Sequence, residues 1–359
     1  MPKPDLKKLF SHIERFSKAP QIHAMITMAK SEPGMTRRFS EFDADPMMPG
    51  VANGVIDLQT QTLLPVSPNV LVTKRCNVSY DPSAECPRFE KFLQEVQPDD
   101  EMRKFLQDLM GYCLMGQVGE NIFAFLWGHG SNGKSVFVEL MAWVLGDYAH
   151  KIAIEMLMRQ QRNSQGPSAD IMSLKGRRFV YANETAEGAR LDEARVKDMT
   201  GGDTLTGRVP YGKADINFSP SHKLFIVGNH KPDISDTSEG MWRRPVLIPF
   251  NQKIPEPKQD LQLLETLKSE GPGILNWMLE GLRDWLNGGL KVPDSVKADT
   301  AAYREEQDIL GDWIGDQCLA GPGCSVAKAE LYNNYKLWTD DNGHRPMSQT
   351  KLTRNIEKF

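Results

Sequence analysis

The residues with the clearest capacity for chemistry form one stretch, Gly128-His129-Gly130-Ser131-Asn132-Gly133-Lys134-Ser135. Its spacing is that of the P-loop, G-x-x-x-x-G-K-[ST], whose curled backbone surrounds phosphate oxygens with N–H groups. We expect Gly128, Gly130 and Gly133 to permit this curl because glycine has no Cβ. The alternative is a glycine-rich turn with a solvated lysine, and the flanking residues distinguish the two.

The flanks supply the strand and the helix that a P-loop requires. Ile122–Trp127 is an apolar run of strand length, and apolar residues at helical spacing follow from Phe137 to Leu145. A helix N-terminus there would direct unpaired N–H groups and a positive dipole end at an anion. Lys134 would add a charge for the β- and γ-phosphates, and Ser135 a hydroxyl for Mg²⁺. We therefore predict that ATP is bound by Gly128, Gly130, Ser131, Asn132, Gly133, Lys134, Ser135 and Val136.

Composition excludes several classes of protein. The 359 residues carry a formal net charge of -4 and a sequence pI of about 6.0, so any nucleic-acid contact must come from a local patch. The five cysteines include no C-x-x-C pair, which argues against structural zinc and favours reduced thiols in a cytosol-like compartment. Because no apolar run reaches transmembrane length and no signal peptide is apparent, we expect no membrane partner.

The order of predicted elements indicates an α/β fold. Strands are expected at Ile122–Trp127, Arg178–Asn183, Leu224–Gly228 and Val246–Phe250. Helical stretches separate the first three, so a mostly parallel sheet covered on both faces is predicted. We expect a mostly helical, collar-like domain over residues 1–117, the P-loop ATPase core over 118–290, and a linker with a partial winged-helix-like segment over 291–359.

Three smaller predictions concern the two ends of the chain. The amphipathic helix from Leu6 to Phe16 is expected to pack on the next domain. Asp43-Ala44-Asp45 could hold a divalent metal, but the prolines that follow favour a turn. The chain stops at Phe359 within a helical pattern, so we expect an incomplete C-terminal domain.

A carboxylate follows the predicted strand that ends at Asn183. Glu184 is at the end of a strand that we expect to lie beside the P-loop strand, which is where a carboxylate holds Mg²⁺ through water and orients the attacking water. Glu187 is close enough to share that role. The alternative is an exposed glutamate at a strand end.

Candidate DNA contacts come from a predicted hairpin tip at 210–213, with Arg208 just before it. Lys213 beside Tyr211 can bind a phosphate while a base or sugar packs on the ring. The alternative is an ordinary surface turn.

Two further motifs follow. Gly228-Asn229 ends a predicted strand, where the amide of Asn229 could position water or simply form a turn. Arg243 and Arg244 precede the next strand, where they could form a solvated face or supply an arginine finger to another subunit's nucleotide.

Taken in order, the motifs resemble those of superfamily 3 helicases, and most closely the helicase part of phage, plasmid and poxvirus primase–helicases. The resemblance rests on the glycine loop, Glu184, Thr200-Gly201-Gly202-Asp203 with Arg208, Gly228-Asn229 and Trp242-Arg243-Arg244, and it extends over residues 40–359. It implies a modified AAA+ core that forms a hexameric ring around single-stranded or forked DNA, hydrolyses ATP with Mg²⁺ and translocates. It also implies the cytoplasm of a bacterial host.

The resemblance assigns roles to individual residues. Lys134 and Ser135 would bind phosphate and Mg²⁺, Glu184 would activate water, and Asn229 would sense the γ-phosphate. Arg243 and Arg244 would reach across a subunit interface. Lys213 would contact DNA in the channel, with Tyr211 and Arg208 beside it.

Two departures from the family pattern stand out. Asn183 takes the place of the first of two acids at the strand end, so Mg²⁺ would depend more on Ser135 and water. No primase domain fits within residues 1–117, so a primase was lost, lies on another chain or belongs to a part of the protein outside this sequence, and priming activity is not assigned. The function predicted is an ATP-dependent replicative DNA helicase of a phage, plasmid or prophage. The alternative is a non-motor initiator or scaffold whose ATP site acts as an assembly switch.

Overall fold

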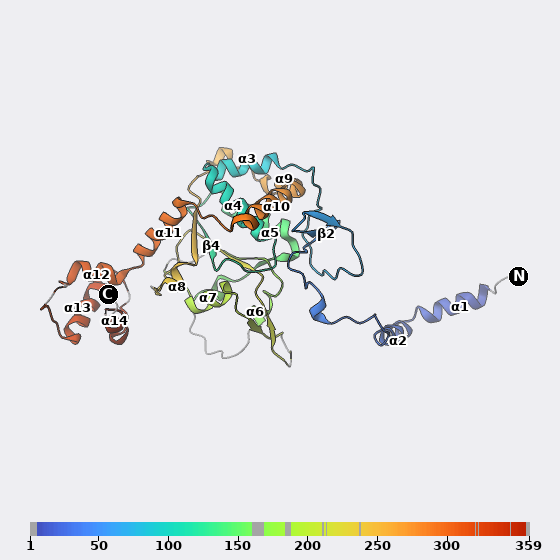
Figure 1. The fold of residues 1–359 in the computed structure, drawn as a ribbon, viewed down its shortest axis with the longest axis horizontal. Helices are drawn as coiled ribbons and strands as arrows, with labels where there is room; N and C mark the ends of the chain where they lie inside the picture. Colours follow the sequence, from blue (N-terminus) through green and yellow to red (C-terminus); the bar gives the residue numbers. More distant parts are fainter. Residues whose placement is uncertain are drawn as a thin grey trace.

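The structure is a computed structural model. It describes residues 6–159, 169–183, 188–209, 212, 214–236, 238–319, 321, 323–344 and 346–356. Figure 1 shows a central body that contains the sheet, with the N-terminal helices extending from one side and a small helical unit connected to the other. None of the helices in these ranges is both long and apolar enough to cross a membrane.

The central sheet is parallel, as predicted. Its five described strands are β4 (Phe123–Trp127), β5 (Ala149–Lys151), β6 (Phe179–Asn183), β9 (Lys223–Gly228) and β10 (Pro245–Pro249). They lie in the order β10-β4-β9-β6-β5, and each neighbouring pair is parallel. The carboxyl ends of β4, β6 and β9 therefore meet at one edge of the sheet. β5 is the strand that the sequence analysis did not predict.

Alternating strand residues face two separate cores, as expected for a parallel sheet covered on both faces. On one face Ala124 and Leu126 pack with α5 (Lys134–Leu145), α4 (Asp100–Tyr112) and α10 (Gly271–Gly288). On the other face Phe123 and Phe125 pack with α7 (Glu193–Thr200), α8 (Glu239–Trp242) and residues near α6 (Ala169–Met172). In Figure 1 the first set of helices lies above the sheet and the second below it.

The first core crosses the domain boundary expected at 117. It joins α3 (Pro87–Val96) and α4 to α5, α9 (Leu263–Ser269) and α10. The closest approach is between α4 and α10, where a Cβ added to Gly281 would lie 2.1 Å from the carbonyl oxygen of Gln107. The division into domains stays a prediction, but the buried core does not separate at 117.

Two buried cations tie the end of α4 to the sheet. Lys223, the first residue of β9, donates to the carbonyl of Met115 at 2.5 Å and lies 4.2 Å from the centre of the Tyr112 ring. Arg178, next to β6, donates to the carbonyl of Leu114. Cations near a helix C-terminus interact favourably with its carbonyls. Burial nevertheless lowers the pKa of Lys223 to about 7.

The N-terminal segment corrects one prediction. Its first helices are α1 (Leu6–Phe16) and α2 (Ala19–Ala29), and a small sheet of β1 (Gly50–Val51), β2 (Gly54–Asp57) and β3 (Thr62–Leu64) follows. The helix at Leu6–Phe16 exists, but it lies next to α2 and apart from the central body in Figure 1, and it leaves Phe10 64% exposed. It does not pack on the next domain. The turn at Asp43 is confirmed, and its carboxylate accepts from the backbone N–H of Thr73 at 2.7 Å.

The C-terminal region begins with a long connecting helix. α11 (Asp294–Glu306) leaves the central body and leads to α12 (Ile309–Gln317), α13 (Lys328–Asp341) and α14 (Gln349–Ile356). The last three helices, which we call the C-terminal unit, surround a core of their own made of Leu310, Trp313, Tyr335 and Leu352.

Candidate nucleotide-binding site

The P-loop connects β4 to α5 along a tightly curved path. Gly128, Ser131 and Gly133 have φ values of 153°, 60° and 83°. A Cβ on Gly128 would lie 2.2 Å from the carbonyl oxygen of Phe250, so glycine is required there for space as well as for conformation. Gly130 differs, because nothing lies within 4 Å of an added Cβ and its φ is not positive. The surrounding residues therefore do not require glycine at 130, and the contact of Gly130 with a phosphate stays a prediction.

Asn132 holds the loop in place from within. Its buried side-chain amide donates to the carbonyl of His129 at 2.9 Å and to that of Phe250 at 2.8 Å. The loop is also fixed from outside, since the backbone N–H of Ile254 donates to the carbonyl of Ser131 at 2.8 Å. The end of β10 thus supports the P-loop, and Asn132 acts on the loop backbone.

Lys134 is a buried cation surrounded by neutral oxygens. Its Nζ donates to the carbonyl of Gly128 at 2.5 Å, to Oδ1 of Asn132 at 3.1 Å and to Oδ1 of Asn229 at 3.3 Å. Within the described residues no carboxylate forms an ion pair with it. Burial lowers the pKa of Lys134 to about 8. A buried ammonium without a counter-ion is costly, and an anion at the loop would lower that cost.

Asn229 comes to Lys134 because β9 lies directly beside β4. Gly228, which ends β9, is in register with Trp127, which ends β4. The prediction that Asn229 lies at a strand end beside the P-loop is confirmed. The expectation that the strand ending at Asn183 lies beside the P-loop strand is wrong, because β9 is inserted between β6 and β4.

The end of β6 nevertheless reaches the same edge of the sheet. Asn183 is in register with Val227 of β9. Its Oδ1 is buried and has no hydrogen-bond partner among the described residues. Glu184 and Glu187 lie outside those residues, so the catalytic and metal-binding roles of Glu184 stay predictions. An unpartnered carbonyl oxygen at this edge suits a hydrated metal ion or a water molecule.

The remaining P-loop residues fit a bound triphosphate. Gly133 is the N-cap of α5, which has 12 residues, so its unpaired N–H groups and positive dipole end are at the loop. Ser135 in the first turn is exposed and Val136 is half-buried. The hydroxyl of Ser135 is therefore accessible to a Mg²⁺ ion that accompanies the phosphates.

The two adjacent arginines have different environments. Arg244 is 8% exposed; its Nε donates to Oγ1 of Thr200 at 3.2 Å, and it also donates to the carbonyl of Gly240. Arg243 is exposed and forms no hydrogen bond or ion pair through its side chain with the described residues. Of the two predicted finger residues, Arg243 has the available guanidinium.

Arg243 also lies at the wrong edge of the sheet for its own P-loop. Pro245 at the start of β10 is in register with Phe123 at the start of β4, whereas the P-loop follows Trp127. About 13 Å of strand separates the two edges at 3.3 Å per residue. A contact between Arg243 and a nucleotide therefore requires the nucleotide of another subunit.

The predicted hairpin is present. β7 (Leu205–Gly207) and β8 (Ile216–Phe218) pair antiparallel. Arg208 donates from Nε to Oδ1 of Asp215 at 2.7 Å, which closes the hairpin across its two arms. Tyr211 and Lys213 lie outside the described residues, so all three DNA contacts stay predictions.

Two residues near the site were not identified from the sequence. Trp127 donates from Nε1 to the carbonyl of Asn229 at 3.2 Å, and its ring meets that of His129 edge-on. Lys231 lies with its Nζ 5.2 Å from the centre of the Trp127 ring. The available signal was their position in the sequence, since Trp127 directly precedes the P-loop and Lys231 comes two residues after Asn229.

Comparisons with known proteins show what this chain is similar to. The family model described as "D5 N terminal like" matches residues 2–98. "Putative helicase L207/L206" of Acanthamoeba polyphaga mimivirus is 29% identical over 336 residues, which are 87% of this chain and 35% of that protein. "Putative primase C962R" of African swine fever virus (isolate Warthog/Namibia/Wart80/1980) is 26% identical over 333 residues, 84% of this chain and 34% of that protein.

The chain thus spans about a third of the length of these curated relatives. Among solved structures, "The apo structure of NrS-1 C terminal region (305-718)" is similar at 16% sequence identity and a TM-score of 0.48. The similarity covers 67% of this chain and 56% of that one.

Proposed function

We propose that this chain belongs to the primase–helicase family and that it is the ATP-hydrolysing motor of a replicative DNA helicase from a phage, plasmid or prophage. The proposal includes assembly into a ring, with single-stranded or forked DNA as the partner. A primase would be a separate domain or protein.

The observation that carries the proposal is the position of Lys134. A buried ammonium in contact with three neutral oxygens, at the N-terminus of a helix, is arranged to receive an anion. Asn229 supports hydrolysis rather than binding alone, because its amide lies where the terminal phosphate would meet the edge of the sheet. When bound, Mg²⁺ would neutralise phosphate charge, and Ser135 and Glu184 are the residues proposed to hold it.

Cooperation between subunits follows from the location of Arg243. Since the Arg243 of one subunit lies a strand's length from its own P-loop, we propose that it completes the site of a neighbour. An isolated subunit would then have an incomplete site. Hydrolysis should accordingly rise with protein concentration as subunits associate.

The test is ATP hydrolysis and strand displacement by the purified chain on a forked DNA duplex, with Lys134→Ala as the control. We expect hydrolysis that single-stranded DNA stimulates, and displacement with ATP but not with a non-hydrolysable analogue. ATP binding and DNA binding without displacement would favour the initiator or scaffold alternative. Absence of nucleotide binding would overturn the proposal.

A further inference from the structure

We propose that α11 connects the C-terminal unit mechanically to the ATP site. In this inference α11 holds residues 229–236, which we call the sensor segment, and Lys231 and Trp127 are positioning residues for Asn229. The inference rests on the proposed function. It adds a route by which the nucleotide and the C-terminal unit influence each other.

The C-terminal end of α11 makes several contacts with the sensor segment. Lys231 Nζ lies 2.8 and 2.7 Å from the two carboxylate oxygens of Glu306. The backbone N–H of Ile234 donates to Oε1 of Gln307 at 2.9 Å. The hydroxyl of the buried Tyr303 donates to the carbonyl of Pro232. These contacts fix the sensor segment to one end of one helix.

The adjacent helix α8 is attached to α11 as well. Arg304 donates to a carboxylate oxygen of Glu239 at 2.6 Å, and the rings of Trp242 and Tyr303 meet edge-on. Trp242 directly precedes Arg243. The helix that holds the sensor segment therefore also supports the turn that carries the exposed arginine.

The same contacts continue to the nucleotide site through Trp127. Lys231 Nζ lies 5.2 Å from the centre of the Trp127 ring and 5.3 Å from that of Tyr303, so it lies between the P-loop strand and α11. Trp127 donates to the carbonyl of Asn229, and the amide of Asn229 contacts Lys134. An anion that attracts Lys134 competes with Asn229 for the ammonium. A shift of Asn229 would then reach α11 through the sensor segment.

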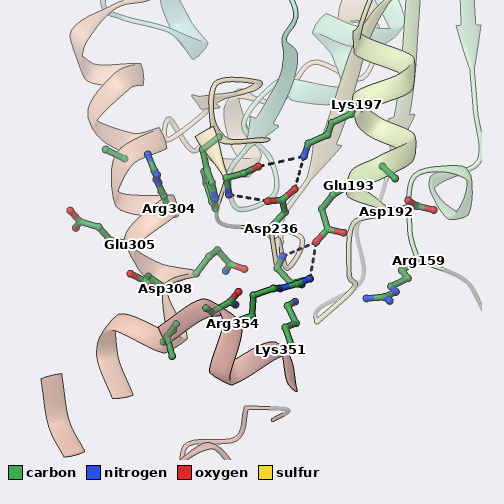
Figure 2. A pocket seen from close by; sticks show the side chains of 18 residues that line it. Arg159, Asp192, Glu193, Lys197, Asp236, Arg304, Glu305, Asp308, Lys351 and Arg354 are labelled. Carbon is green, nitrogen blue, oxygen red and sulfur yellow. Dashed lines mark hydrogen bonds and ion pairs between the residues drawn. The ribbon is translucent and has the colours of Figure 1, made fainter. Parts of the chain in front are cut away.

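The far end of α11 leads to a body with its own core. Asp308 follows α11 and caps α12 by accepting from the backbone N–H of Gly311 at 3.0 Å. A cavity of about 1250 Å³ separates the C-terminal unit from the central body. Figure 2 shows its charged lining, with Glu193 and Asp236 from the central body and Lys351 and Arg354 from α14. The cavity leaves room for the C-terminal unit to turn with α11.

The test uses hydrogen exchange of the full chain with and without a non-hydrolysable ATP analogue. In the wild type we expect the analogue to change protection in residues 229–236 and also in 294–317. Lys231→Met and Glu306→Gln should confine the change to the P-loop and the sensor segment. Lys231→Arg keeps both the charge and the contact with the ring, so it should restore the wild-type response.

Kinetics supply a second readout. Because partly exposed ion pairs are individually weak, we expect Lys231→Met to lower kcat by about 2- to 5-fold while the Kd of the analogue stays the same. Asp294→Asn is the matched control, since Asp294 pairs with Lys297 within the first turn of the same helix. It should leave both quantities unchanged.

The outcomes separate the two proposals. If the wild type neither binds nor hydrolyses ATP, the proposed function fails. If it hydrolyses ATP but residues 294–317 respond identically in wild type and Lys231→Met, the mechanical connection is overturned while the proposed function stands. If nucleotide binding does not change hydrogen exchange in residues 294–317 of the wild type, the connection is also overturned.

Discussion

The amide oxygen of Asn229 accepts a hydrogen bond from the ammonium of Lys134 at 3.3 Å, although the two residues are 95 positions apart. Lys134 begins the helix that follows β4, and Asn229 follows β9. A neutral partner keeps the cation in place without cancelling its charge. The pair thus places a buried positive charge and a polar amide at one point on the edge of the sheet.

Substitutions of Asn229 should separate binding from hydrolysis. Asn229→Ala leaves Lys134 charged, so the Kd of an ATP analogue should change little while kcat falls by roughly 10²-fold, as for loss of one preorganised polar group. Asn229→Asp would pair with Lys134 and should weaken binding. Fluorescent-nucleotide titration and phosphate release measure the two effects. Equal kcat in Asn229→Ala and wild type would contradict the assigned role.

Nucleotide affinity should fall above about pH 8. Burial lowers the pKa of Lys134 to about 8 in the free protein, whereas a bound phosphate would raise it. Above pH 8 binding must therefore take up a proton, and the Kd should rise by about tenfold per pH unit. Titrations between pH 7 and 9.5 measure this slope. Lys134→Arg is the control, because its guanidinium stays charged and its affinity should not change with pH over that range.

Substitution of Arg243 and of Arg244 by alanine should have different effects. Arg243→Ala should fold normally and lose hydrolysis by roughly 10³-fold or more if it acts as a finger. Arg244→Ala removes buried hydrogen bonds to Thr200 and Gly240, so its main effect should be a loss of about 1–3 kcal/mol of stability. Thermal unfolding and phosphate release distinguish the two.

Mixing the Lys134→Ala and Arg243→Ala proteins tests whether Arg243 acts on the nucleotide of a neighbouring subunit. Neither Lys134→Ala nor Arg243→Ala protein is expected to hydrolyse ATP alone. A mixture should recover part of the activity, because some interfaces combine an intact P-loop with an intact Arg243. Full activity of Arg243→Ala as a monomer would exclude a role between subunits.

The crossing of α4 and α10 should not tolerate a methyl group. A Cβ on Gly281 would lie 2.1 Å from the carbonyl oxygen of Gln107, so Gly281→Ala should destabilise the protein by about 1–3 kcal/mol. Gly315→Ala is the control, because nothing lies within 4 Å of its added Cβ in α12, and alanine is the better helix former. Chemical denaturation measures both. If Gly281→Ala and Gly315→Ala changed the free energy of unfolding equally, α4 and α10 could move apart without destabilising the protein.

Local sequence was sufficient to predict the P-loop, the strand before it and the helix after it. The apolar run before Gly128 and the helical spacing after Lys134 depend on near neighbours, and β4 and α5 form as predicted. The strand-end position of Asn229 was predicted for the same reason. The wrong predictions concern contacts between segments distant in the sequence. The spacing in α1 is amphipathic, for example, but its Phe10, Ile13 and Phe16 are exposed.

The order of the strands could not be predicted from local sequence. Nothing near Asn183 or Asn229 indicates which of their strands lies beside β4, because that depends on how the connecting segments cross the sheet. The order decides that Asn229, rather than the end of β6, contacts Lys134. The parallel register of β10 and β4, in contrast, places Arg243 at the edge of the sheet opposite its own P-loop.

The sequence by itself determined the glycine-rich loop between a strand and a helix, because glycine spacing and apolar periodicity act over a few residues. The tertiary structure decided which arginine is buried, which strand brings an amide to the lysine, and that α11 holds the sensor segment. These results depend on packing between segments far apart in the sequence, as in the hydrogen bond between Lys134 and Asn229, which are 95 positions apart. Such packing is set by the energy of the whole core and not by any local pattern.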